Sequence, residues 1–339
     1  MRSHSFNHRA LGVSAVALTL GVSSVLIAQA PTPAPPQAPP TAAAQQAPPV
    51  SPQALGTQFE FVISVADGKG QPVAGLGRSE IKMSENGIPA EILEVTPYPV
   101  PVQLTIAVDN GPASGDALSH YRSGLAGLVK ALPPGVEVTL LTTSPQPRAV
   151  VRASRDQQRL LRAVNEFAPE AEAPRFTDTI VEFAKRYRTE FEKTRKLDSL
   201  PILLMVTTTV AEAVSYEVPE ITEAFGLLKQ RKAKVFIVSL SSQLRREGLA
   251  PINDNRQALI GIPVAQLTGG RYESISNSTR IATLLPEWGQ LIAALHQRHV
   301  NQMLVKVNRP GDLTGPLRNP RIEVARAGMT GLVSLDGLP

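Results

Sequence analysis

The stretch from Val102 to Ser114 constrains the fold of this chain more than any other. A run of apolar and β-branched residues ends at Asp109, and a turn that begins with Asn110 precedes a segment of helical periodicity. Open α/β sheets bind ligands where a buried strand delivers a side chain to the loop before a helix. We therefore expect a parallel sheet with Asp109 at its ligand-binding edge.

Residues 101–300 alternate between strand-like and helix-like segments, which predicts a doubly wound, mostly parallel α/β sheet. The expected strands lie at 102–109, 136–143, 148–152, 201–208, 234–240 and 271–275. The second and third of these are joined by a short turn, so they should pair antiparallel. Helices are expected after caps at Asp116, Ser154 and Thr179, from Pro219, and near 255–267 and 279–298.

Both ends of the folded part have β character. Residues 57–98 contain alternating apolar positions and an Asn86-Gly87 pair typical of a tight hairpin. Residues 301–339 return to short strand-like runs separated by Pro and Gly. Because three strands are marginal alone, we expect the two ends to pair in one small β-sandwich-like layer.

The first 54 residues predict export. Residues 1–30 combine a basic start, an apolar run and Ala28-Gln29-Ala30, which fits a signal peptide, with an uncleaved membrane anchor as the alternative. Residues 31–54 are rich in Pro and Ala and predict an extended linker. The remaining divisions are a small β unit at 55–99, the α/β domain at 100–300 and C-terminal strands at 301–339. The protein should thus be periplasmic or secreted, touching a membrane only through its N-terminus.

Composition excludes several classes of function. The chain has no cysteine, which rules out disulfides, thiolate metal sites and a cysteine nucleophile. The formal charge is +5, and residues 1–30 contribute two arginines and no acids, so the remaining chain carries a mild +3. The sequence has no arginine-rich stripe interleaved with aromatics, so nucleic-acid binding is not expected. His296 and His299 lie near a helix end, where cations are favoured, and we interpret them as solvated. Trp288 is expected in the core or on a domain seam, with a role in an interface as the alternative.

Three motifs carry a family resemblance. They are the segment from Val65 to Val73 with the later Ser84-Glu85-Asn86-Gly87, the strand from Pro101 to Asp109, and the turn from Leu267 to Tyr272. In order and spacing they resemble the secreted bacterial branch of von Willebrand factor type A-related proteins over about residues 57–310. The resemblance implies a von Willebrand A-like α/β domain that binds proteins.

Such domains commonly bind a divalent metal through an aspartate, hydroxyls two and four residues later, a distant threonine and a second aspartate. Asp109 and Thr177 match this pattern, but the hydroxyl positions are Gly111 and Ala113, and the last position falls in Thr207-Thr208-Thr209. Magnesium prefers six hard oxygen ligands. The adhesion site is therefore degenerate, and no cofactor is expected; Mg²⁺ or Mn²⁺ could use only Asp109, Thr177 and Thr208.

We interpret the chain as an exported, non-catalytic adhesion or scaffold module with a protein partner in the cell envelope. Its binding loops should be 109–116, 174–179 and 208–218. The candidate partner-binding residues are Asp109, Asn110, Ser114, Thr177, Asp178, Thr208 and Thr209. The alternatives are a Mg²⁺- or Mn²⁺-dependent adhesion module using Asp109, a hydrolase with no catalytic residue yet identified, and a purely structural envelope component.

Overall fold

The computed structural model describes residues 58–194, 198–241, 256–311, 318–326 and 334–335. The predicted export segment and linker, residues 1–54, lie outside these ranges. Within the described ranges, none of the helices combines the length and the apolar character needed to cross a membrane.

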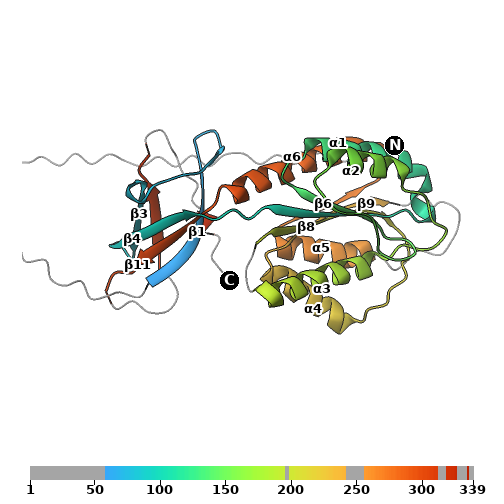
Figure 1. Cartoon of the computed structure of the whole chain (residues 1–339). Helices are drawn as coiled ribbons and strands as arrows, with labels where there is room; N and C mark the ends of the chain where they lie inside the picture. Colours follow the sequence, from blue (N-terminus) through green and yellow to red (C-terminus); the bar gives the residue numbers. More distant parts are fainter. Residues whose placement is uncertain (1–57, 195–197, 242–255, 312–317, 327–333, 336–339) are drawn as a thin grey trace, which may run out of the picture. The chain divides into compact units, whose positions relative to one another are not determined.

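A six-stranded sheet forms the centre of the α/β domain (Figure 1). Its order is β10-β9-β8-β5-β6-β7, and every neighbouring pair is parallel except β6 and β7. The strands are β5 (Val102–Val108), β6 (Glu137–Thr142), β7 (Arg148–Ser154), β8 (Leu200–Thr209), β9 (Lys234–Ser241) and β10 (Arg271–Ile275). The doubly wound, mostly parallel sheet predicted from the sequence is confirmed, including its antiparallel edge.

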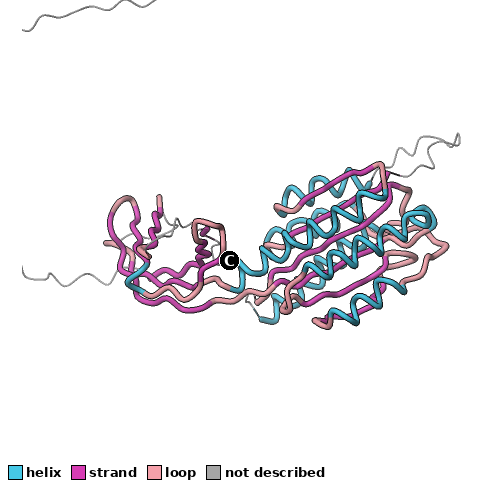
Figure 2. Tube along the Cα trace, turned by 90° about the horizontal axis from the view of Figure 1, so that it is seen from above, coloured by secondary structure: helices cyan, strands magenta, loops and turns pink. Residues whose placement is uncertain are grey.

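Helices cover both faces of this sheet. Figure 1 shows α1, α2 and α6 on one face and α3, α4 and α5 on the other, and in Figure 2 the helices run alongside the strands. Each face has its own apolar cluster, and Trp288 packs in the first, 5.7 Å from Phe236 between ring centroids. The helices are α1 (Leu118–Ala131), α2 (Gln157–Glu166), α3 (Phe176–Thr194), α4 (Val218–Gln230), α5 (Arg256–Thr268) and α6 (Ile281–Val300).

The second sheet draws its strands from both sides of the α/β domain in sequence. Its order is β12-β3-β4-β11-β1-β13, with β2 paired to β1, so strands that follow α6 lie beside strands that precede β5. The strands are β1 (Gln58–Ala66), β2 (Pro72–Val73), β3 (Ile81–Glu85), β4 (Ile88–Pro97), β11 (Met303–Asn308), β12 (Pro320–Val324) and β13 (Ser334–Leu335). The predicted β layer from the two chain ends is confirmed.

A buried ion pair fastens the late strands to the early ones. The guanidinium of Arg309 donates from Nε and Nη2 to the two carboxylate oxygens of Glu85, at 2.9 and 2.6 Å. Both side chains are buried, and the backbone N–H of Arg318 also donates to Glu85. Hydrogen bonds from Arg309 and Arg318 hold the pKa of Glu85 below its ordinary value despite burial.

Three predicted helix caps are wrong. Asp116 lies in a 3₁₀ turn (Pro112–Ala117) that leads directly into α1. The cap of α2 is Asp156, whose Oδ1 accepts from the N–H of Arg159, while Ser154 precedes it. Thr179 lies inside α3, where its hydroxyl donates to the carbonyl of Arg175. Only for α2 does a neighbouring side chain take the predicted role, since the cap position of α1, Ala117, makes no side-chain hydrogen bond.

The solvated role predicted for His296 is also wrong. Its side chain is buried, and Nδ1 accepts from the backbone N–H of Val102 at 3.2 Å. Burial lowers the pKa of the imidazole, which favours the neutral ring that this bond requires. His296 therefore joins the end of α6 to the start of β5.

Candidate functional site

The candidate site lies at the carboxyl edge of the six-stranded sheet. Loops after β5, β6 and β8 and the segment before α3 meet there through backbone hydrogen bonds. Glu170 donates to the carbonyl of Asn110, Arg175 to that of Thr143, and Ala213 to that of Pro174. Because parallel strands bring their following loops to one edge, this is where α/β folds place ligands.

Asp109 is 1% exposed, and its carboxylate holds two backbone segments together. Oδ1 accepts from the N–H of Gly111 at 2.8 Å, and Oδ2 accepts from the N–H of Thr208 at 3.1 Å. Burial raises the pKa of Asp109, while these hydrogen bonds oppose the rise. The hydroxyl of Thr208 also contacts that of Tyr121 at 3.0 Å. Both predicted ligands, Asp109 and Thr208, therefore have partners within the protein.

At Gly111, the position of the first missing hydroxyl, there is little room for a side chain. A Cβ at Gly111 would lie 3.0 Å from the carbonyl oxygen of Glu172, 3.1 Å from Oγ of Ser144 and 3.2 Å from Oδ1 of Asp109. These contacts are tighter than ordinary van der Waals packing. Oxygen atoms of the protein itself therefore surround the position where the pattern calls for the first hydroxyl.

Thr177, the third predicted ligand, is bound by a carboxylate that the sequence analysis missed. Its hydroxyl donates to Oε1 of Glu212 at 2.5 Å and its N–H donates to Oε2 at 2.8 Å. Burial raises the pKa of Glu212, and the two bonds to Thr177 oppose this rise. Glu212 thus ties the loop after β8 to the first turn of α3.

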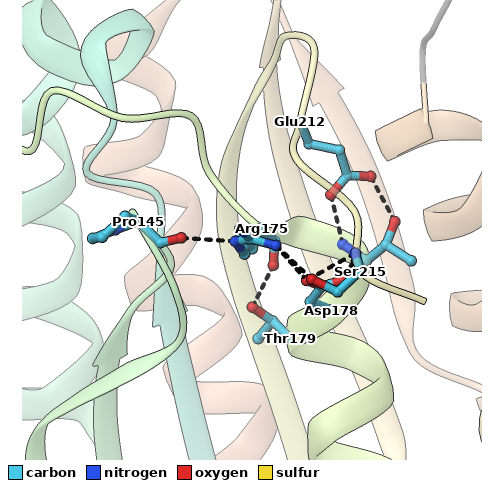
Figure 3. A network of polar contacts seen from close by, with 7 residues as sticks. Pro145, Arg175, Asp178, Thr179, Glu212 and Ser215 are labelled. Atoms are coloured by element: carbon cyan, nitrogen blue, oxygen red, sulfur yellow. Dashed lines mark hydrogen bonds and ion pairs between the residues drawn. The ribbon is translucent and has the colours of Figure 1, made fainter.

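Arg175 was also missed as a site residue. Figure 3 shows its guanidinium between two loops and the start of α3. Nε donates to the carbonyl of Pro145 at 2.8 Å, and Nη1 donates to Asp178 at 3.1 Å and to Ser215 at 2.6 Å. Asp178 accepts in addition from the N–H of Ser215. A guanidinium is planar, always charged and carries five N–H groups, so it can join several acceptors as a bound metal ion does.

The other predicted partner-binding residues are engaged in the same way. Asn110 donates to the carbonyl of Ala168 and accepts from the N–H of Ser144, and the hydroxyl of Ser114 donates to the carbonyl of Gly111. Of the seven candidates, six are buried, and Thr209 is half-buried beside Ser239. They shape the loops from beneath, while the accessible surface belongs to their neighbours.

The residues present do not fit the divalent metal of related domains. Two hydroxyl ligands are missing, and both oxygens of Asp109 accept backbone hydrogen bonds. Within the described ranges there is no group of three or more His, Asp or Glu residues arranged to hold a metal. Magnesium needs a near-octahedral set of oxygens, which this arrangement does not supply.

The topology and the placement of Asp109 agree on the type of fold. The α/β domain has the doubly wound, mostly parallel architecture expected of a von Willebrand A-like domain. No family profile and no curated protein matches the sequence.

Several solved structures show a limited likeness to this chain. A von Willebrand factor type A protein from Catenulispora acidiphila has 9% identity and a TM-score of 0.45, over 84% of this chain and 72% of that one. The protein BatB from Bacteroides thetaiotaomicron has 14% identity and a TM-score of 0.40, over 57% and 98%. The vWF domain of the type V pili tip protein Mfa5 from Porphyromonas gingivalis has 12% identity and a TM-score of 0.40, over 64% and 99%.

Proposed function

We propose that this chain is an exported, non-catalytic protein-interaction module that docks a partner through the carboxyl edge of its α/β sheet without a bridging cation. One observation carries the proposal. Side chains of Arg175 and Glu212 join the loops that a metal joins in related domains. A prearranged surface loses less conformational freedom on binding than a mobile one.

The groups available to a partner follow from the accessible residues of these loops. Exposed positions include Pro112, Asp116, Gln146, Glu172 and Glu217. They offer apolar surface, backbone groups and carboxylates. Recognition should rest on these groups, because the buried candidates beneath them have partners within the protein.

A non-catalytic role is proposed because the carboxylates inside the edge are committed to structure. Asp109 binds backbone N–H groups, Asp178 binds Arg175 and Ser215, and Glu212 binds Thr177. A general acid or base needs an open side towards its substrate. The partner is expected in the cell envelope, since the first 30 residues predict export.

Site-specific photo-cross-linking tests this proposal. A photoreactive residue replaces Gln146 at the carboxyl edge, and a matched variant replaces Gln290, an exposed glutamine on α6. Cells that produce each variant are irradiated with EDTA or with Mg²⁺, and adducts are identified by mass spectrometry. We expect one defined protein adduct from Gln146 in both conditions and none from Gln290. An adduct that requires Mg²⁺, or equal adducts from both positions, would contradict the proposal.

A further inference from the structure

A cavity lies at the opposite, amino edge of the same sheet. Its volume is about 300 Å³. Its walls come from the last turns of α4, α5 and α6, the first residues of β8 and β9, the segment between β4 and β5, and Val62 of β1. This volume is at the lower end of the range for small-molecule sites in proteins. The cavity is separate from the loops proposed above to dock a protein.

The walls of this cavity combine strong positive charge with apolar surface. Five lysine and arginine side chains line it, namely Lys229, Arg231, Lys232, Lys234 and Arg298. Leucine side chains such as Leu200 and Leu295 supply the apolar part. Within the described part of the chain, no aspartate or glutamate lines the cavity.

Helix ends explain only part of this charge. Lys229 and Arg298 lie in the last turns of α4 and α6, where cations offset the negative end of the helix dipole. Arg231 is the C-cap residue of α4 and is 2% exposed, whereas Lys234 begins a strand, where no helix end favours a cation. Their convergence on one cavity indicates a role beyond helix capping.

We propose that this cavity binds a soluble phosphate monoester that carries an apolar group. Arginine and lysine recognise phosphate through charge-assisted hydrogen bonds, which are stronger than neutral ones. The leucine walls would cover the apolar group, and the volume is sufficient for a group the size of one aromatic ring.

Calorimetric titration of the full chain with three probes tests the proposal. Phenyl phosphate carries both features, inorganic phosphate only the charge, and benzyl alcohol only the apolar ring. We expect saturable binding of phenyl phosphate, binding of inorganic phosphate weaker by about tenfold or more, and no binding of benzyl alcohol. Equal binding of all three probes, or binding by none, would overturn the proposal.

Variants place the binding within the cavity. Lys234→Met should weaken phenyl phosphate binding by about tenfold, the effect of losing one charge-assisted hydrogen bond. Lys229→Met, at an exposed position, is a second test if the first variant folds poorly. The matched control is Lys130→Met, an exposed lysine in the last turn of α1 that does not line the cavity. Unchanged affinity in both cavity variants, or an equal loss in the control, would refute the assignment.

Discussion

Replacing Asp109 by asparagine distinguishes a structural carboxylate from a metal ligand. In the native protein each carboxylate oxygen accepts one backbone N–H, from Gly111 and from Thr208. Asparagine retains one oxygen and turns an NH₂ group towards the other N–H. A buried donor left unsatisfied costs about 1–3 kcal/mol. Removing the charge returns part of the cost of burying a carboxylate, so we expect a net loss of about 2 kcal/mol.

Urea unfolding followed by tryptophan fluorescence measures this loss in the α/β domain. Trp288 is the single tryptophan and is 1% exposed in the core of that domain. With a typical denaturant dependence, a loss of about 2 kcal/mol lowers the midpoint by about 1 M urea. The matched control is Asp116→Asn, an exposed residue of the same loop, for which we expect a change below about 0.5 kcal/mol.

The comparison between EDTA and Mg²⁺ decides the interpretation. If Asp109 is structural, Asp109→Asn loses the same stability in both solutions, and Mg²⁺ does not stabilise the native protein. A ligand that binds only the folded state raises its stability in proportion to its saturation. The reasoning is refuted if Mg²⁺ stabilises the native protein, Asp109→Asn abolishes that effect, and the variant is otherwise as stable in EDTA.

Three further predictions concern packing and charge. Gly270→Ala would place a Cβ 1.9 Å from the carbonyl oxygen of Val235, so it should destabilise the α/β domain by about 3 kcal/mol in the same urea assay. Glu85→Gln leaves the buried Arg309 without its counter-charge and should cost about 3–5 kcal/mol, seen as faster hydrogen exchange in the second sheet; unchanged exchange would contradict this. The hydrogen bond from Arg326 lowers the pKa of Glu80 from 4.5 to about 2, so the stability it gives is complete above about pH 4.5 and is lost as the pH falls towards 2. Thermal unfolding measured at several pH values should show that Glu80→Gln loses less stability than the native protein between pH 4.5 and 2. An equal loss of stability in both proteins would contradict the prediction.

The sheets were predictable because their signals are local. The apolar run that ends at Asp109 predicted β5 to within one residue, and β10 has the bounds expected from its sequence. Asn86-Gly87 forms the expected hairpin, with positive φ at both residues as a type I′ turn requires. Periodicity and turn chemistry depend on near neighbours, so the sequence displays them directly.

The side chains that close the candidate site were not predictable in the same way. Glu212 and Thr177 are far apart in sequence and meet only when β8 and α3 come together in the fold. A single charged residue in a loop gives no periodic or spacing signal. Arg175 is another such residue, and its three acceptors come together only in the fold. His296 shows the same limit, since a helix end can be buried by packing against a distant strand.

Titration of the full chain with Mn²⁺, followed by electron paramagnetic resonance, tests the central claim most directly. The signal of free Mn²⁺ falls when the ion binds to protein, so the measurement counts bound ions. Our account predicts the same free signal for the native protein and for Asp109→Asn, because the site lacks the oxygens that an octahedral ion needs. Binding of one Mn²⁺ per native chain that is lost in Asp109→Asn would contradict it.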